Sequence, residues 1–225
     1  MEPVETIADY IIKNNRNIGH WNALLEEWIL SIERFSRVTE GDAPYWYNER
    51  ANIGVLAGAA WRCGRIALEE FQHEKIDVTS DGEAKDTAQK PRNGRCDLWI
   101  CDDHSAAETV EAKFKWLNMC MNSEKMVDFV KACLKTAVDD AIKTKNARDD
   151  GIKSIGVAFL PLYAKKDKVG DLQELSKVIA ETIKCACKTR ADLVAWCFPK
   201  RLRDHVSKEN NNYLPGVIML AKVAK

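Results

Sequence analysis

Two acidic residues and a lysine stand at a spacing that could support metal-dependent chemistry. Asp97 lies in a short β-rich run, residues 96–101, and Glu111 and Lys113 lie in the next run, residues 108–116. Alternate residues of a strand point to the same face, so Glu111 and Lys113 share one face. Mg²⁺ binds carboxylate oxygens, and a metal-bound water beside an amine is a nucleophile for phosphodiesters. The three residues therefore predict a metal-dependent hydrolytic site.

A hairpin would bring these side chains together. The segment between the two runs, residues 102–106, is rich in turn-forming residues. A turn centred between His104 and Ser105 places Asp97 opposite Ala112, and a shift of one residue places it opposite the neighbouring glutamate. In both registers two carboxylates and one ammonium converge. The alternative interpretation is a cross-strand ion pair on the surface with no catalytic role.

The order Asp97, then Glu111-Ala112-Lys113, resembles the Asp…Glu-x-Lys motif of the PD-(D/E)XK nuclease superfamily, which has the restriction-endonuclease-like fold. Cys96 stands where the family name has proline, a position that varies among members. Many members carry an acidic residue on the helix before the hairpin, and Tyr47-Asn48-Glu49-Arg50 resembles that feature. The resemblance covers residues 47–160.

The resemblance implies a role for each residue of the motif. Asp97 and Glu111 would bind the metal ion, Mg²⁺ or Mn²⁺, and Lys113 would position or activate the attacking water. Glu49 would be a further metal ligand, either directly or through a water molecule. Asp97, Glu111 and Lys113 are thus the expected catalytic residues, and Asp97, Glu111 and Glu49 the expected metal site.

The elements before the hairpin are expected to be helical. Apolar side chains three and four apart predict an amphipathic helix over residues 21–35 and a second over 47–73, and Ile7, Tyr10 and Ile11 fit a short amphipathic turn. The helix over 47–73 would also carry Glu69 and Glu70, the alternatives to Glu49, near its far end.

A polar stretch over residues 79–94 predicts a long loop before the hairpin. We expect an α/β fold with a restriction-endonuclease-like mixed β-sheet flanked by helices, in which residues 1–44 form an N-terminal helical extension and residues 45–225 the nuclease-like core. The remaining apolar runs predict helices over 123–144 and 171–188 and strands over 155–160, 193–198 and 217–221.

The charge distribution locates the possible nucleic-acid surface. The formal net charge is zero, but residues 1–80 hold 8 Lys/Arg against 13 Asp/Glu (−5) and residues 81–225 hold 26 against 21 (+5). Phosphate backbones favour concentrated positive charge, so a nucleic-acid surface is expected in the second part. Each residue that could contact a phosphate could instead be an ordinary solvated cation on the surface. These candidates are Arg95, Lys115, Lys200, Arg201 and Arg203.

Several other classes of protein do not fit the sequence. The eight cysteines are scattered and predict free thiols rather than a disulfide framework or a zinc site. There is no GxxxxGK[ST] loop, no GxGxxG after a strand and no GxSxG elbow, so nucleotide-driven and serine-hydrolase chemistry are not expected. No apolar run is long enough to cross a bilayer and the first residues are acidic, so we expect a cytoplasmic protein with no membrane partner.

Two functions remain at this stage. The first is a Mg²⁺-dependent, endonuclease-like phosphodiesterase acting on DNA, with RNA also open, and the complete acid–acid–lysine set favours it. The second is a catalytically inactive nuclease-fold protein that acts as an interaction or assembly module. The zero net charge favours the second, as do the apolar N-terminal helices, which could form a homo-oligomer interface.

Overall fold

The computed structural model describes residues 7–76, 92–102, 107–146 and 152–225. Within these ranges nine strands form one mixed sheet, with the main order β1-β7-β9-β6-β4-β3-β2 and with β5 and β8 paired to the long central strand β6. The outer strands of the main path are therefore β1 and β2. The strands are β1 (Ile7–Ile12), β2 (Ile66–Lys75), β3 (Arg92–Cys101), β4 (Glu108–Phe114), β5 (Leu117–Asn118), β6 (Lys153–Lys165), β7 (Leu193–Phe198), β8 (Asn212–Tyr213) and β9 (Val217–Val223).

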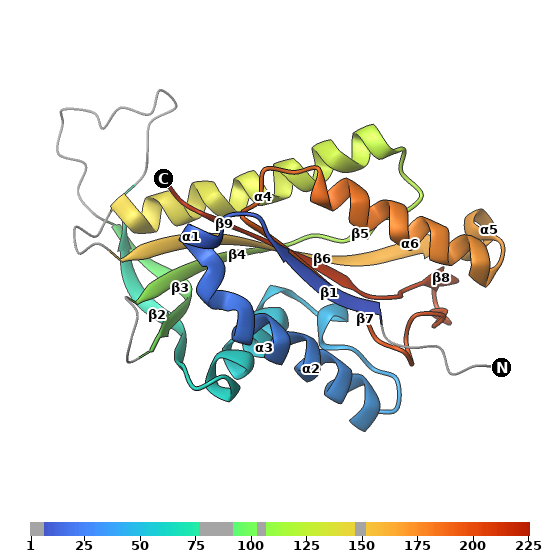
Figure 1. Ribbon diagram of the computed structural model, residues 1–225, viewed down its shortest axis with the longest axis horizontal. Helices are drawn as coiled ribbons and strands as arrows, with labels where there is room; N and C mark the ends of the chain where they lie inside the picture. The colour runs from blue at the N-terminus through green and yellow to red at the C-terminus, as the bar shows by residue number, and fades with distance from the viewer. Residues whose placement is uncertain (1–6, 77–91, 103–106, 147–151) are drawn as a thin grey trace.

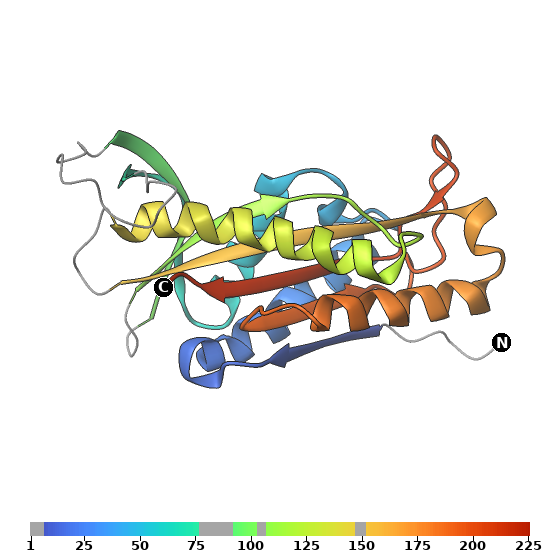
Figure 2. The same ribbon diagram turned by 90° about the horizontal axis from the view of Figure 1, so that it is seen from above.

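Helices cover both faces of the sheet. The first three lie on one face, and the last three lie on the other (Figure 1). Seen from above, α4 and α6 run side by side over their face (Figure 2). The helices are α1 (Asn15–Ile18), α2 (Asn22–Val38), α3 (Glu49–Arg62), α4 (Ser123–Asn146), α5 (Lys166–Val169) and α6 (Leu172–Cys187), with short 3₁₀ turns at Gly19–Trp21 and Pro44–Trp46.

The sheet separates two hydrophobic cores. Strand β6 serves both, because its alternate side chains point to opposite faces. Val157 and Phe159 pack with Trp28 of α2 and the other residues of the first core. Ala158 and Leu160 pack in the second core beneath α4 and α6. Because both faces of β6 are buried along its middle, successive residues there are all apolar, which explains the continuous apolar run that predicted this strand.

The first segment corrects one prediction. Residues 7–12 are not a helical turn but strand β1, paired antiparallel with β7 from Ile7↔Phe198 to Ile12↔Leu193. The apolar spacing of so short a segment fits both structures, and pairing with a distant strand decides between them. The N-terminal segment is therefore not purely helical. The division into 1–44 and 45–225 stays a prediction, although residues on both sides of it share the first core.

The helix expected over 47–73 is also shorter than predicted. It ends at Arg62, and Gly64 follows with φ of 84°, a left-handed conformation that glycine adopts without steric cost. The chain then continues as β2 and pairs antiparallel with β3. The apolar residues after Gly64 therefore belong to strand β2 and not to the predicted helix.

The other predicted elements are confirmed, and most differ by a few residues at their ends. Strand β6 is the exception, because it runs from Lys153 to Lys165 and continues through Pro161, well beyond the predicted 155–160. The amphipathic helix over 21–35 is α2, the two later helices are α4 and α6, and the three later strands are β6, β7 and β9. Of the loop expected over 79–94, residues 79–91 lie outside the described residues, and residues 92–94 belong to β3.

Two further features bear on the expected partners. None of the helices in the described ranges is long and apolar enough to span a membrane. The outer faces of the N-terminal helices expose Leu30 and Val38 on α2 and Trp61 on α3. Self-association through these helices stays a prediction.

Candidate functional site

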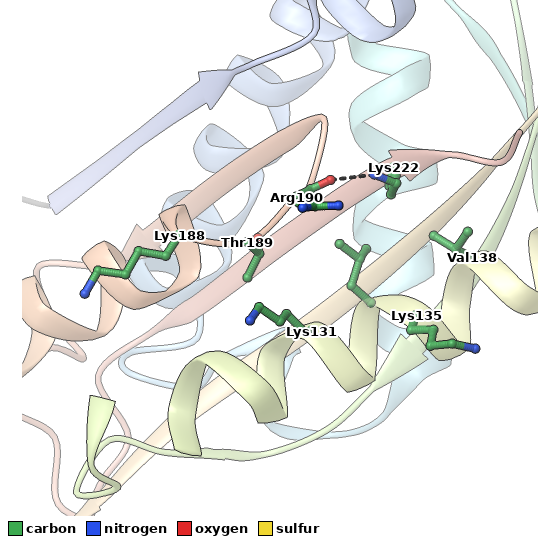
Figure 3. Close-up of a pocket in the computed structure, with 8 residues that line it drawn as sticks. Lys131, Lys135, Val138, Lys188, Thr189, Arg190 and Lys222 are labelled. Atoms are coloured by element: carbon green, nitrogen blue, oxygen red, sulfur yellow. Dashed lines mark hydrogen bonds between the residues drawn. The ribbon is translucent and has the colours of Figure 1, made fainter. Parts of the chain in front are cut away.

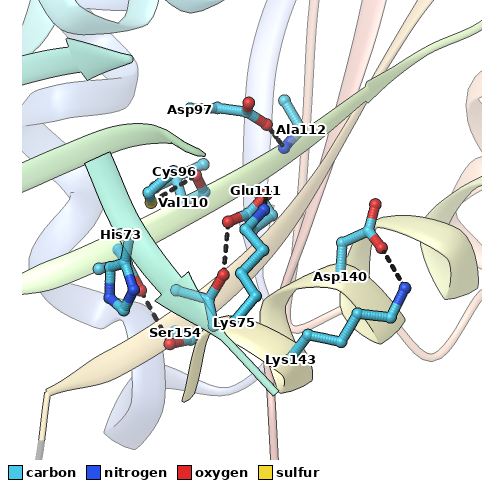
Figure 4. A network of polar contacts seen from close by, with 12 residues as sticks. His73, Lys75, Cys96, Asp97, Val110, Glu111, Ala112, Asp140, Lys143 and Ser154 are labelled. Carbon is cyan, nitrogen blue, oxygen red and sulfur yellow. Dashed lines mark hydrogen bonds and ion pairs between the residues drawn. The ribbon is translucent and has the colours of Figure 1, made fainter. Parts of the chain in front are cut away.

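Strands β3 and β4 pair antiparallel as predicted, and their pairing ends next to Asp97; the expected turn at His104 and Ser105 lies outside the described residues. The paired residues run from Leu98↔Val110 to Ile100↔Glu108, which is the register shifted by one residue from the turn centred between His104 and Ser105. Just beyond the last pair, Oδ2 of Asp97 accepts a hydrogen bond of 2.7 Å from the backbone N–H of Ala112 (Figure 4). The Asp97 carboxylate therefore takes the place of the backbone carbonyl with which a partner strand would accept this hydrogen bond from β4.

Glu49 reaches the same strand edge from the beginning of α3. Asn48 caps this helix: its side chain accepts a hydrogen bond of 2.9 Å from the backbone N–H of Ala51. The Glu49 carboxylate accepts a hydrogen bond from the backbone of Phe114. Since Ala112 and Phe114 are two residues apart, their N–H groups lie along one edge of β4. Asp97 and Glu49 thus occupy successive positions on that edge.

The charges around Glu49 change its titration. Burial raises the pKa of Glu49 above its ordinary value, and the Asp97 and Asp140 carboxylates act in the same direction. The Lys113 ammonium and the hydrogen bond from the Phe114 backbone oppose this rise without cancelling it. The Glu49 carboxyl is therefore coupled to Asp97, Lys113 and Asp140, and these four side chains form the edge cluster.

Lys113 is held by a carboxylate that the sequence did not suggest. Its Nζ lies 2.8 Å from Oδ2 of Asp140 on α4, and Lys143 lies 2.9 Å from the other oxygen of that carboxylate. Burial lowers the pKa of Lys113, but the hydrogen bond and charge of Asp140, together with the charges of Glu49 and Asp97, outweigh it and raise the pKa. Lys113 is therefore a cation at neutral pH, able to donate hydrogen bonds but not to accept a proton.

Glu111 points to the same face as Lys113 but is engaged elsewhere. Its side chain is 2% exposed; Oε2 lies 2.8 Å from Nζ of Lys75, and Oε1 accepts a hydrogen bond of 2.5 Å from Thr144 (Figure 4). Burial raises the pKa of Glu111, although the hydrogen bonds from Lys75 and Thr144 oppose the rise. Burial next to this carboxylate also raises the pKa of Cys96 to about 12, so its thiol stays protonated.

The carboxylates of this region fit a metal ion only in part. Among the described residues, no three His, Cys, Asp or Glu side chains gather closely enough to hold a metal ion between them. Asp97 and Glu49 suit Mg²⁺, which commonly takes one or two carboxylates with water molecules in its other positions. Glu111 does not suit it as it is held here, because Lys75 and Thr144 occupy both of its oxygens.

Two of the predicted phosphate contacts lie near the hairpin. Arg95, on β3, forms a surface ion pair of 2.7 Å with Glu70. Glu70 also lies 3.2 Å from Arg50, so it serves as a surface partner for arginines. Lys115 is exposed and follows directly after β4. Of the two, Lys115 lies closer in the chain to Lys113 and is the better placed to meet a ligand there.

The basic run after β7 lies apart from the edge cluster. Lys200, Arg201 and Arg203 follow β7, which is three strands away from β4 in the sheet, or roughly 14 Å across the strands. The backbone N–H of Lys200 donates to Glu33 of α2. Arg203 is partly withdrawn from solvent, and burial lowers its pKa. The structure therefore does not bring these three residues to the predicted site.

Sequence reasoning missed three residues of this region: Lys75, Asp140 and Thr144. Lys75 follows the helix predicted over 47–73, and no pattern placed it on a strand of the sheet. Asp140 and Thr144 are four apart on α4 and so share one helical face, next to the buried Ala137 and Ala141. A polar pair beside the apolar stripe of a predicted helix was a usable signal for contact with the strand face.

The comparisons with known proteins give no relative. No protein-family model, no curated protein and no solved structure matches this chain.

Proposed function

We propose that this protein is a Mg²⁺-dependent phosphodiesterase that cleaves nucleic acid, with DNA as the substrate, on a restriction-endonuclease-like core. The proposal is carried by one observation: Asp97 and Glu49 occupy successive positions on the free edge of β4, and the Lys113 ammonium is coupled to both. Two adjoining carboxylates beside a fixed cation suit a scissile phosphate and its metal ion. The motif that resembles the PD-(D/E)XK nucleases supports the same function.

Each residue of the edge cluster has a different role in the proposed reaction. Asp97 and Glu49 would hold the cation, which supplies charge neutralisation at the phosphate and a more acidic water. Lys113 donates hydrogen bonds to the attacking water or to a non-bridging phosphate oxygen, since its raised pKa keeps it protonated. Asp140 fixes the direction of the Lys113 side chain. Lys115, exposed just past β4, contacts the neighbouring phosphate.

The test is a cleavage assay on single- and double-stranded DNA and RNA, with Mg²⁺ or Mn²⁺ and with EDTA. The wild type cleaves DNA only with metal, and Lys113→Met lowers the rate at least about 100-fold. Asp97→Asn abolishes cleavage and weakens Mg²⁺ binding measured by calorimetry. Lys177→Met, on the exposed face of α6, is the matched control and keeps the wild-type rate. Wild-type protein that neither cleaves any substrate nor binds Mg²⁺ would refute the proposal.

A second candidate is a nuclease-fold module without catalysis. The ion pair between Lys75 and Glu111 favours it, because it neutralises one of the two acidic residues of the motif inside the protein. In this case oligonucleotides or protein partners bind without cleavage. Lys113→Met then changes the binding affinity, and no cleavage is measured for either the wild type or the variant. The calorimetric arm separates the two candidates, since a module without catalysis needs no Mg²⁺ affinity.

A further inference from the structure

A basic groove lies between α4, the turn after α6, and β9. It encloses about 560 Å³, which is within the size range of small-molecule sites. Its floor includes the apolar side chains of Leu134 and Val138. Among the described residues, five cations and no carboxylate line it; the cations are Lys131, Lys135, Lys188, Arg190 and Lys222.

The cations take different positions in this groove. The Lys131 side chain lies between α4 and Thr189, and Arg190 lies at the turn beside Lys222 (Figure 3). Lys135 and Lys188 extend outwards from its two sides (Figure 3). Lys131 and Lys135 have carboxylate partners on α4, at 3.4 and 2.6 Å. Neither Lys188 nor Arg190 forms an ion pair with a carboxylate in the described ranges, so the groove keeps excess positive charge.

The backbone of the turn does not offset this charge. A helix carboxyl end normally presents unpaired carbonyl oxygens, which repel anions. Here Nζ of Lys13 donates to the carbonyls of Cys187 and Thr189, at 2.6 and 2.9 Å. Nζ of Lys222 donates to the carbonyl of Arg190 at 2.6 Å, as the dashed line in Figure 3 marks. Three carbonyls of the turn are thus paired with ammonium groups before any ligand arrives.

The groove is separate from the edge cluster. It lies over β9, whereas Glu111 and Lys113 belong to β4, and β6 runs between these two strands. Helix α4 crosses above all three and presents Lys131 and Lys135 to the groove but Asp140 and Thr144 to β4. A ligand in the groove therefore does not occupy the proposed catalytic position, and the inference does not rest on the proposed function.

We propose that this groove binds a nucleoside di- or triphosphate. The phosphates lie against Lys131, Arg190 and Lys222, and the base packs on Leu134 and Val138. Several cations around a small volume match the charge of a polyphosphate, and the apolar floor gives the base a surface to cover. The chain lacks a GxxxxGK[ST] loop, so the proposed role is binding and not hydrolysis.

The test is calorimetric titration of the full chain with ATP in EDTA, so that no divalent cation links the nucleotide to the edge cluster. The Lys131→Ala/Arg190→Ala variant should bind ATP about tenfold or more weakly, because two charge-assisted contacts are lost. Both residues are exposed, so the fold should persist, which circular dichroism checks. Lys177→Ala/Lys208→Ala removes the same charge from exposed positions elsewhere and should bind as the wild type does.

Three further ligands test the chemistry. Adenosine and tripolyphosphate should each bind about tenfold or more weakly than ATP, since each lacks one half of the contacts. Equal affinity for tripolyphosphate and ATP would overturn the role of the apolar floor. A twelve-nucleotide single strand that binds more tightly than ATP, and that the groove variant loses, would replace the nucleotide with a nucleic-acid strand. Equal ATP binding by the groove variant and its control would overturn the site itself.

Discussion

The Lys75–Glu111 ion pair is almost withdrawn from solvent, with side chains 12% and 2% exposed. Removing one partner of such a pair leaves a buried charge uncompensated, which costs about 3–5 kcal/mol. We therefore expect Lys75→Met to lower the free energy of unfolding by that amount in urea titrations. Lys75→Met/Glu111→Gln should recover most of the loss, because Gln can still accept from Thr144 without a charge. A double variant as unstable as the sum of its single variants would contradict this account.

Glu49 and Asp140 should give opposite pH dependences of stability. Burial raises the pKa of Glu49 above 4.5, so the folded protein binds its proton more readily than the unfolded chain, and stability falls as pH rises from 4.5 through the raised pKa. The pKa of Asp140 is lowered below 3.8, because its hydrogen bonds from Lys113 and Lys143 outweigh burial. Its contribution is present above 3.8 and is lost as pH falls through the lowered pKa.

Urea titrations of the wild type, Glu49→Gln and Asp140→Asn across this range measure both effects. Glu49→Gln should remove part of the fall above pH 4.5, because Glu111 also has a raised pKa, and Asp140→Asn should remove part of the loss below pH 3.8. Matching profiles for Glu49→Gln and the wild type would show that Glu49 is not buried in the way described here.

Single residues of the site were predictable only where the rule is local. Glu111 and Lys113 share a face because strands alternate, and Asp97 and Glu49 were found through the motif that surrounds them. Lys75 was not predictable, because it contacts Glu111 from 36 residues away and from a strand mistaken for a helix. The alternative of a surface ion pair anticipated a cationic partner for Glu111, but no pattern indicated that the partner would be Lys75 or that the pair would be buried.

At the scale of elements, the packing of α4 on β6 depends on one glycine. A Cβ on Gly156 would lie 2.5 Å from the backbone nitrogen of Val138 and 2.6 Å from the carbonyl carbon of Ala137, both on α4. Gly156→Ala should therefore push the helix outwards and lower the free energy of unfolding by about 1–3 kcal/mol. It should also slow cleavage, since α4 carries Asp140.

Gly58→Ala is the matched control for this prediction. Gly58 lies inside α3, and a Cβ there would meet nothing within 4 Å. This substitution should raise stability by about 0.5–1 kcal/mol, because alanine loses less conformational freedom than glycine in a helix. Thermal unfolding followed by circular dichroism compares the two, and equal melting temperatures for both variants would exclude close packing at Gly156.

Elements with a sustained apolar pattern were predictable, and the two outer strands of the sheet were not. Helices α2, α4 and α6 follow their apolar stripes, and strands β6, β7 and β9 follow their continuous apolar runs. Strand β1 has six residues, as β7 does, but only β7 is apolar and buried throughout. Strand β1 lies at the edge of the sheet with partly exposed side chains, and its pairing with β7 determines its structure. Strand β2 was not predicted, because the helical spacing of apolar residues in α3 continues by chance beyond Gly64, where the helix has already ended.

At the scale of the molecule, the sheet joins the two cores into one unit. Leu24 in the first core and Leu175 in the second are both buried, and Leu→Ala in a core costs about 2–5 kcal/mol. Because β6 contributes to both cores, we expect either variant to lower one common transition, coincident by far-ultraviolet circular dichroism and tryptophan fluorescence. A second transition in Leu24→Ala alone would show that the N-terminal part unfolds by itself.

The two outer strands of the sheet have different capacities to accept a further strand. In β2, Glu70 has φ of 48°, and Glu69 and Glu74 are exposed charges, which together make an irregular, repulsive edge. Strand β1 is regular and apolar, with Asp9 as its one acidic residue. Amyloid-like growth requires two receptive edges on every molecule. A sheet that is receptive along β1 alone could join one neighbour, and edge-to-edge polymerisation would stop at that pair.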